Sequence, residues 1–300
     1  MRPPLRQFLL FLWLGCLPPA LWAGQLAIII DDIGYSATLG ERSLQLPGEF
    51  TFAILPQAPY GPRLARLANE RGREVMLHNP MSNTRNLPLD GGALSGEMTH
   101  RDFMATLDYN LEAIPEARGL NNHMGSQLTQ ETRPMGWLME RLGERGFYFI
   151  DSRTTADSRA LETAQRYQIP SLQRDVFLDH ERDSEQIARQ LAEAIELARE
   201  RGYAIAIGHP YPETLAVLEH IEPALKRAGV ELVPVSRLLH DQPGSRPHTS
   251  GSCLAPPQSL WHQPEQEPRP TAIRSWIDIG LPDTHSDSDG VRLNQHLLFP

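Results

Sequence analysis

The sequence predicts an α/β fold, a distorted (β/α) barrel of about seven mostly parallel strands. Apolar segments typical of buried strands alternate with amphipathic helical segments along most of the chain. Polar residues follow many of these strands, as they do at the C-terminal rim of a barrel. No glycine-rich phosphate loop follows the first strand, and the polar motifs do not gather at one switch point. A closed or nearly closed barrel is therefore favoured over a doubly wound sheet.

The first predicted strand is a fully apolar run, residues 26–30, that leads directly into Asp31 and Asp32. Further strands are expected over short apolar segments at 50–55, 74–77, 119–123, 147–150, 203–207 and 231–234, with 172–178 either a strand or an extended loop. Helices are expected where apolar residues recur at helical spacing, at 62–71, 99–114, 134–146, 158–167, 183–202 and 213–228. Residues 79–96 are polar and glycine-rich, which predicts a long loop of the kind that carries function.

The chain divides into three predicted parts: a signal peptide (1–23), a folded catalytic domain (24–240) and a disordered, proline-rich tail (241–300). The signal is indicated by Arg2 and Arg6, an apolar core at 8–14 and a small residue, Ala23, at the expected cleavage site. The apolar core is too short to span a bilayer, so the mature chain is expected to lack a transmembrane span and to be periplasmic or secreted.

Lipoprotein processing at Cys16 is a less favoured alternative, because Trp13 fits that pattern poorly. The other cysteine, Cys253, lies in the predicted tail, so the domain is expected to have no internal disulfide and no cysteine nucleophile. The formal charge of −9 and the absence of a basic stripe argue against a nucleic-acid partner.

Ionisable or amide side chains stand at the ends of five predicted strands: Asp31 and Asp32, His78, Asn122 and His123, Asp151, and His209. Each has a structural alternative, since aspartates often cap helices or turns and a rim histidine can simply be hydrogen-bonded. In a barrel all five segments face one rim, so a shared site is the better explanation. Two adjacent carboxylates are costly to bury unless a metal ion or proton transfer uses them.

One aspartate and two histidines make a ligand set that leaves positions open for water and substrate, which favours metal-assisted hydrolysis. The metal would lower the pKa of a water and polarise a carbonyl. A second carboxylate would serve as general base, and a histidine opposite would protonate the leaving group. Because consecutive side chains of an extended strand point in opposite directions, Asp31 and Asp32 are expected to divide the roles of base and ligand.

Five short motifs carry a more specific signal: Asp31-Asp32-Ile33-Gly34, His78-Asn79-Pro80-Met81, Asn121-Asn122-His123-Met124-Gly125-Ser126, Phe149-Ile150-Asp151-Ser152 and Ile207-Gly208-His209-Pro210-Tyr211-Pro212. Their combination and order resemble the divergent polysaccharide deacetylase family, a branch of the chitooligosaccharide-deacetylase-like superfamily. The resemblance covers roughly residues 25–240. It implies a distorted (β/α) barrel, a divalent metal, most often Zn²⁺, and hydrolysis of N-acetyl or O-acetyl groups on a glycan.

Carried over by position, the resemblance implies that Asp31 is the general base and Asp32 the metal-ligating aspartate. His78 corresponds to the first metal histidine and His209 to the histidine that acts as general acid. Asp151 lies where a carboxylate supports that last histidine or lines the pocket.

The chain departs from the family pattern at one position. Ordinary members carry a second histidine four residues after the first, where this chain has Ser82, and His123 is the expected replacement ligand. Asn122 and Ser126 are further candidates for lining the pocket. Arg174 and Asp175 could form an ion pair that supports the site, but a salt bridge on the surface is the simpler interpretation. Aromatic residues near the predicted loops that could stack on sugar rings are Tyr35, Tyr60 and Tyr211.

The predicted function is a metal-dependent hydrolase that removes acetyl groups from an envelope or extracellular polysaccharide. The alternative is a non-catalytic periplasmic protein that binds a glycan or an envelope protein in the same cleft. Ser82 in place of a histidine favours the alternative, while the retained Asp31 and His209 favour the enzyme. A phosphoesterase is less favoured, because no cluster of arginine or lysine accompanies the motifs to receive phosphate.

Overall fold

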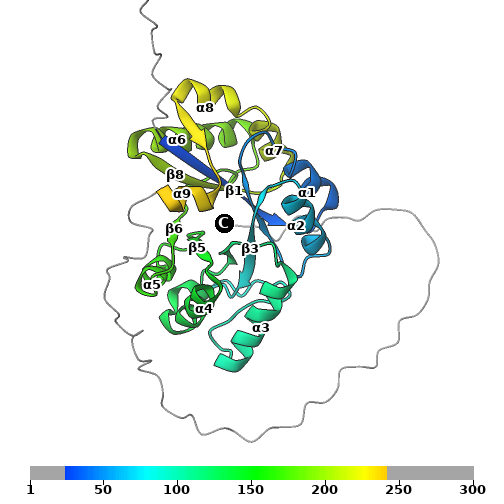
Figure 1. The fold of residues 1–300 in the computed structure, drawn as a ribbon, viewed down its shortest axis with the longest axis vertical. Coiled ribbons are helices and arrows are strands. Elements are labelled where there is room, and N and C mark those ends of the chain that lie inside the picture. The colour runs from blue at the N-terminus through cyan, green and yellow to red at the C-terminus, as the bar shows by residue number, and fades with distance from the viewer. Residues whose placement is uncertain (1–23, 242–300) are drawn as a thin grey trace, which may run out of the picture. The chain divides into compact units, whose positions relative to one another are not determined.

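A single parallel sheet organises the described part of the chain, residues 24–241 of a computed structural model (Figure 1). Its central strand, β1 (Gly24–Ile33), pairs with β2 (Thr51–Ile54) on one side and with β8 (Tyr203–Gly208) on the other. Within these residues nine strands are present in the order β6-β5-β4-β3-β2-β1-β8-β7, with β9 (Val230–Leu232) paired to the start of β1. The others are β3 (Glu74–Met81), β4 (Gly119–Met124), β5 (Tyr148–Asp151), β6 (Ser171–Gln173) and β7 (Val176–Phe177).

The two ends of this sheet are joined by the chain itself. β6 pairs with β5 at one end, and β7 pairs with β8 at the other, yet only Arg174 and Asp175 separate the two strands. The Arg174 amide donates to the carbonyl of Asp151 in β5, and the next amide, that of Asp175, donates to the carbonyl of Ile205 in β8 (2.9 Å each). One extended segment therefore changes partner midway and draws the sheet into a distorted barrel, as predicted.

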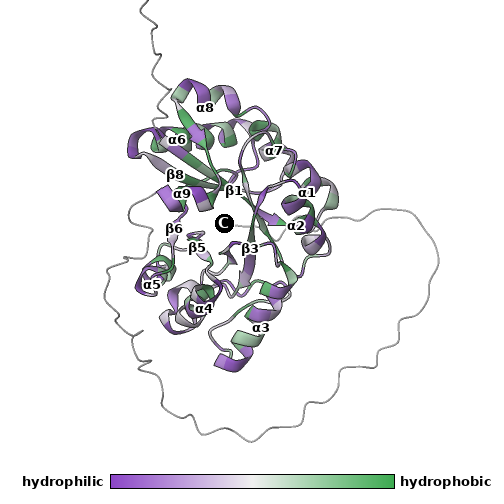
Figure 2. Ribbon diagram, in the orientation of Figure 1, coloured by the Kyte–Doolittle hydropathy of each residue, from purple (hydrophilic) through white to green (hydrophobic). Residues whose placement is uncertain are grey.

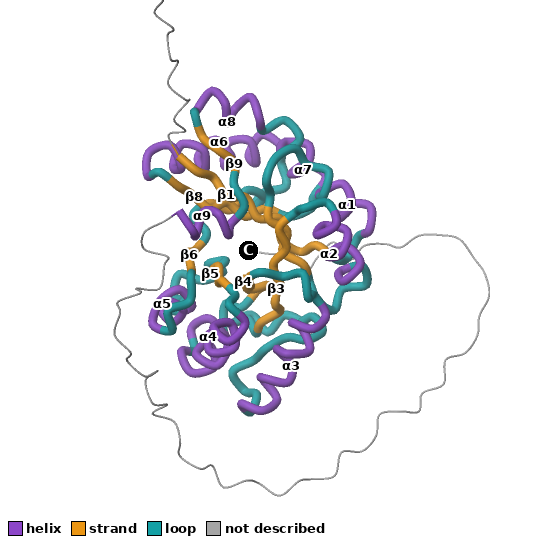
Figure 3. Tube along the Cα trace, viewed as in Figure 1, coloured by secondary structure: helices purple, strands orange, loops and turns teal. Residues whose placement is uncertain are grey.

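The helices lie outside the strands, except for α9, which packs against the inward-facing residues (Figures 1 and 3). They are α1 (Ala37–Ser43), α2 (Gly61–Glu70), α3 (His100–Ala113), the short 3₁₀ turn η1 (Leu128–Gln130), α4 (Thr132–Arg145), α5 (Ala160–Arg166), α6 (Ser184–Arg201), α7 (Pro212–Leu218), α8 (Glu222–Ala228) and α9 (Val235–Asp241). Side-chain caps begin several of them. The Thr99 hydroxyl accepts from the Asp102 amide, and Asp183 accepts from two amides at the start of α6.

Alternate residues of the strands belong to two apolar clusters. Figure 2 shows hydrophobic segments, in green, along central strands such as β1. In β1, Leu26, Ile28 and Ile30 pack outward beneath the surrounding helices. Ala27 and Ile29 face inward, where Leu238 of α9 and its neighbours fill the barrel interior. Because side chains alternate between the two faces of a strand, this alternation decides which polar residues face the interior at the strand ends.

The predicted α/β barrel is confirmed, with differences in particular elements. β3 continues to Met81, four residues beyond the predicted strand at 74–77. The helix expected at 213–228 is two helices, because the Pro223 ring would clash with the carbonyl four residues earlier in a continuous helix. The described residues hold more strands than the expected seven because the segment left open at 172–178 contributes two short strands, β6 and β7, each with a different partner.

The C-terminal helix α9 was not predicted, and it extends to Asp241, one residue past the predicted domain boundary. The expected signal peptide and proline-rich tail lie outside the described residues. Between residues 24 and 241, no helix is both long and apolar enough to cross a membrane.

Candidate active site

The inward-facing positions turn from apolar to polar at the carboxyl ends of the strands. Each of three polar residues lies two positions after an inward-facing apolar residue of its strand: Asp31 after Ile29, His78 after Met76, and His209 after Ile207. The strand alternation therefore carries these three side chains to the same end of the barrel interior. All three are almost fully buried.

Asp32 joins this group because its backbone is not extended. Its φ is +56°, in the left-handed region, and the pairing of β1 with β2 shifts register between Ile30 and Ile33. Both carboxylates consequently approach His78 Nε2, at 3.0 Å from Asp32 Oδ1 and 3.7 Å from Asp31 Oδ2. The expectation that the two carboxylates point apart was wrong, since it assumed an extended chain.

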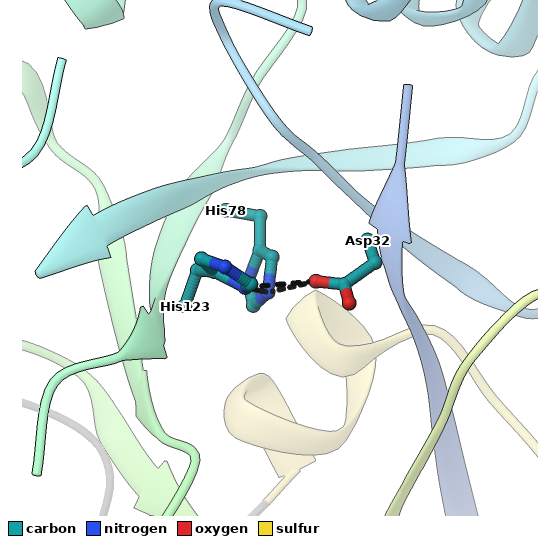
Figure 4. A group of neighbouring side chains, drawn as sticks. All are labelled: Asp32, His78 and His123. Atoms are coloured by element: carbon teal, nitrogen blue, oxygen red, sulfur yellow. Dashed lines mark hydrogen bonds and ion pairs between the residues drawn. The ribbon is translucent and has the colours of Figure 1, made fainter. Parts of the chain in front are cut away.

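Asp32, His78 and His123 form a compact cluster from the ends of β1, β3 and β4 (Figure 4). Asp32 Oδ1 lies 3.0 Å from His78 Nε2 and 2.8 Å from His123 Nδ1, and these two nitrogens are 3.2 Å apart. The residues are at most 9% exposed. Ligand atoms of a tetrahedral zinc site stand about 3.3 Å apart, so this cluster fits a divalent cation after only small side-chain shifts.

The far nitrogen of each imidazole is held by an oxygen acceptor. His78 Nδ1 lies 2.7 Å from Asn121 Oδ1, and His123 Nε2 lies 2.9 Å from Asp90 Oδ2. A proton on each far nitrogen leaves the near nitrogen with a free lone pair that faces Asp32, as metal-ligating histidines require. The Asn121 amide also donates to Asp31 Oδ1 at 2.8 Å. One amide side chain therefore orients both a predicted ligand and the predicted base.

The two adjacent carboxylates differ in acidity. Burial raises the pKa of Asp31, and the nearby histidines offset this only in part. Burial would also raise the pKa of Asp32, but His123 and His78 outweigh it and hold that pKa well below its usual range. Burial likewise opposes the charge on His123, but Asp32 and Asp90 raise its pKa to about 10. A cation would thus replace a proton shared between His123 and these carboxylates.

His209 faces the cluster from β8 and has its own carboxylate partner. Asp179 Oδ1 lies 2.9 Å from His209 Nδ1, while Asp179 Oδ2 accepts from the His209 amide at 2.6 Å and from the Thr214 hydroxyl at 2.8 Å. Burial disfavours the imidazolium, but Asp179 outweighs burial and raises the pKa of His209 to about 9. His209 Nε2 points towards the cluster, 3.8 Å from Asp32 Oδ2. A protonated imidazole is therefore available at neutral pH.

The carboxylate that supports His209 is thus Asp179 rather than Asp151. Asp151 shares the outward parity of Phe149, which packs in the outer cluster. Its carboxylate accepts from the Arg153 amide at 2.8 Å and from the Ser158 hydroxyl at 2.7 Å. Asp151 fixes the loop after β5 and does not contribute a group to the cluster.

Asn122 and Ser126 also organise loops. The Asn122 side chain accepts from the Ser152 amide at 2.9 Å and donates to the Met124 carbonyl at 2.7 Å. The Ser126 hydroxyl accepts from the Thr84 amide at 3.0 Å. The bonds to Ser152 and Thr84 connect the end of β4 to neighbouring rim loops, which holds His123 in place.

Arg174 and Asp175 bind different partners. The Arg174 guanidinium donates to the carbonyls of Ser152 and Arg153, while Asp175 forms a surface salt bridge with Arg201 at 3.0 Å. Ser82 is buried, and its carbonyl accepts from two amides at the start of η1, but it is not part of the ligand cluster.

Three residues of the site were missed by the sequence reasoning: Asp90, Asn121 and Asp179. Asn121 had a usable signal, because it stands two residues before His123 and shares its strand face. Asp90 lies in the loop at 79–96 that was singled out as functional, and Asp179 follows the segment left open as strand or loop. Nothing in the local sequence paired either aspartate with its histidine.

A parallel barrel with an Asp-His-His cluster where its strands end defines the class of deacetylase-like (β/α) barrels. Within that class, this chain belongs to the divergent polysaccharide deacetylase family, whose family model matches residues 28–239. The resemblance found in the five motifs is thereby confirmed.

Similar proteins extend over most of the chain. It is 36% identical to the uncharacterized protein YibQ of Escherichia coli K12, covering 80% of this chain and 75% of that protein. It is 33% identical to an uncharacterized protein of Haemophilus influenzae, covering 86% and 88% of the two chains. Among solved structures, an uncharacterized protein of Agrobacterium tumefaciens C58 matches with a TM-score of 0.68 and 25% identity, over 72% of this chain and 89% of that one.

Proposed function

We propose that this protein is a metal-dependent hydrolase that removes acetyl groups from an envelope or extracellular polysaccharide. One observation carries the proposal: a buried Asp-His-His cluster lies at the same barrel end as two further groups suited to proton transfer, Asp31 and His209. Membership of the divergent polysaccharide deacetylase family supports an acetylated glycan as the substrate.

Asp32, His78 and His123 would hold the cation, and we propose Zn²⁺ because two imidazoles and one carboxylate are a common zinc donor set. When bound, the cation would lower the pKa of a water molecule and polarise the acyl carbonyl. His78 and His123 keep the tautomers needed for this through Asn121 and Asp90.

Asp31 is assigned the role of general base. Burial raises its pKa, which makes its carboxylate a better proton acceptor than an ordinary aspartate, and the Asn121 amide fixes its orientation. His209 is assigned the role of general acid. Asp179 keeps it protonated at neutral pH, so Nε2 can donate a proton to the departing amine or alcohol.

Metal analysis of the purified protein and acetate release from chitin and peptidoglycan fragments test the proposal. Asp31→Asn and His209→Ala should keep the bound metal, because both leave the three ligands intact, and should lower acetate release by about 10²-fold or more. A control at the exposed His240 should change neither quantity. Metal-free protein in which Asp32, His78 and His123 take up no added zinc would contradict the mechanism.

The second candidate function is glycan or partner binding without catalysis, and Ser82 in place of the usual histidine favours it. Asp31→Asn separates the two possibilities. A catalytic protein loses its biological function in this variant, whereas a binding protein retains both function and glycan affinity.

We also propose that the mature protein is periplasmic or secreted, on the basis of the signal-like N-terminal sequence. Cleavage after Ala23 would leave Gly24, the first residue of β1, as the new N-terminus. N-terminal sequencing of protein from the fractionated cell envelope tests this. A mature chain that begins at a lipid-modified Cys16 would instead support the lipoprotein alternative.

A further inference from the structure

Tyr211 lies two residues after His209, and its side chain is oriented against the usual preference of tyrosine. The residue as a whole is partly exposed, yet its hydroxyl oxygen is buried, and within the described residues no acceptor receives its proton. Arg182, whose guanidinium interacts with the hydroxyl, can only donate. Tyrosine normally leaves its hydroxyl at the wet end of the side chain, or gives it a partner when buried. A buried hydroxyl without an acceptor is unfavourable, so its orientation needs a cause.

The ring contacts of Tyr211 are made with protein groups. The ring stacks on the His209 imidazole with centroids 5.4 Å apart and an interplanar angle of 25°. The Arg182 guanidinium carbon lies 3.7 Å from the ring centroid, a cation–π contact. These contacts hold the ring in place and occupy its faces, which were candidates, from the sequence, for stacking on a sugar ring. The hydroxyl is therefore the group that Tyr211 offers to a ligand.

The surroundings of the hydroxyl place it at the active site. Burial and then the carboxylate of Asp32 raise the pKa of Tyr211 to about 12, and Arg182 opposes this only in part, so the hydroxyl keeps its proton at neutral pH and can donate it in a hydrogen bond. The stacking partner is the residue assigned to protonate the leaving group. A ligand that accepts from this hydroxyl would consequently lie on the leaving-group side of the site.

We propose that the Tyr211 hydroxyl donates a hydrogen bond to an oxygen of the acylated sugar, on the side of the group that His209 protonates. The inference rests on the proposed function for the identity of the ligand, an N- or O-acetylated sugar. In this role Tyr211 selects for a polar substituent next to the acyl group, and its ring at the same time keeps the His209 imidazole in place.

Tyr211→Phe tests the inference, because it removes the hydroxyl and preserves the ring that stacks on His209. Binding of N-acetylglucosamine oligomers, measured by calorimetry in an Asp31→Asn background, should weaken about 3- to 10-fold, as expected for one lost neutral hydrogen bond. In the otherwise native enzyme KM should rise by the same factor, with kcat within about twofold. The Tm should stay the same or rise, since the hydroxyl gives its proton to no internal acceptor.

Tyr148→Phe is the matched control. Its buried hydroxyl donates to Glu74 Oε1 at 3.0 Å, at the opposite ends of β5 and β3 from the active site. This variant should lower the Tm and leave glycan affinity unchanged. Unchanged affinity in Tyr211→Phe would overturn the inference, and so would a fall in its Tm like that of the control or a loss confined to kcat.

The outcomes also separate this inference from the proposed function. If the native protein releases no acetate but the Asp31→Asn protein binds the oligomer and Tyr211→Phe weakens that binding, the hydrolase proposal fails and the role of Tyr211 stands. If neither the oligomer nor acetylated peptidoglycan fragments bind, the inference fails together with the proposed substrate class.

Discussion

His123 can ligate a cation through Nδ1 only while its proton resides on Nε2, and the Asp90 carboxylate 2.9 Å away favours that tautomer. Asp90→Ala should therefore lower metal affinity about 10- to 100-fold, the usual effect of removing such an outer partner. Competition between the metal-free protein and a chromogenic zinc chelator measures this without any assay of activity.

Tyr35→Phe provides the control for that measurement. The Tyr35 hydroxyl donates to the other oxygen of Asp90, so the variant loosens the carboxylate and keeps its bond to His123. Its effect on zinc affinity should be clearly smaller than that of Asp90→Ala. Equal zinc affinity in the Asp90→Ala and native proteins would show that His123 needs no outer support.

Asp179 controls the proton on His209. Asp179→Asn keeps an acceptor near His209 Nδ1 but removes the charge that raises the pKa of His209 to about 9. Burial then dominates and lowers that pKa, so the high-pH limb of the kcat/KM profile should move towards neutral pH and activity at pH 8 should fall about tenfold.

Thr214→Val is the matched variant for this test, because it removes another hydrogen bond to the same carboxylate and leaves the charge in place. Its high-pH limb should stay close to that of the native enzyme. NMR titration of the His209 ring in metal-free protein checks the same shift directly. An unchanged limb in Asp179→Asn would exclude His209 as the group that titrates there.

These contacts also show how far the candidate site was predictable. Strand alternation predicted a common rim for Asp31, His78 and His209, because each lies two residues after an apolar residue that faces inward. Asp90 and Asp179 could not be found in this way. Each reaches its histidine from a loop or strand end 33 or 30 residues away, so the pairing depends on tertiary structure.

β1 illustrates the same limit within one element. Its apolar run and its polar end were read correctly from the sequence, but the side-chain direction of Asp32 depends on a left-handed φ of +56°. That conformation accompanies a shift in pairing between β1 and β2, which a single strand's sequence does not encode. Similarly, the sequence could not distinguish a strand from an extended loop at 172–178, because β6 and β7 are short and pair with different neighbours.

α9 is expected to stabilise the barrel from within. Leu238 is fully buried against the inner cluster, so Leu238→Ala should lower the free energy of unfolding by about 2–4 kcal/mol through lost burial and an internal cavity. Urea unfolding measures the change. Arg237→Ala, on the same helix, removes an exposed ion pair with Glu231 and should cost about 0–1 kcal/mol. Comparable losses in both variants would contradict a packing role specific to Leu238.

The barrel as a whole concentrates charge that no single segment would hold. Asp31, Asp32, His78, His123 and His209 come from four strands spread over most of the domain, and all are buried at one end of the interior. Burial of this many ionisable groups is favourable only if their charges compensate one another or a cation. The stability of the fold should therefore depend on both pH and metal.

The direction of the pH dependence follows from the two raised histidine pKa values. Without metal, His123 and His209 have pKa values of about 10 and about 9, against 6.5 for an unperturbed histidine. The folded state thus binds these protons more tightly than the unfolded state does. Their contribution to stability is complete below pH about 6.5 and is lost as the pH rises through 9 and 10.

The Tm of metal-free protein should consequently fall between pH 7 and pH 10, by several degrees or more for a domain of this size. Saturating zinc should raise the Tm throughout and flatten the fall, because the cation replaces the proton on His123 and stabilises only the folded state. Thermal unfolding followed by circular dichroism, with chelator or with zinc, gives both curves. A metal-free Tm that stays level or rises up to pH 10 would mean that these imidazoles are not held protonated by the carboxylates around them.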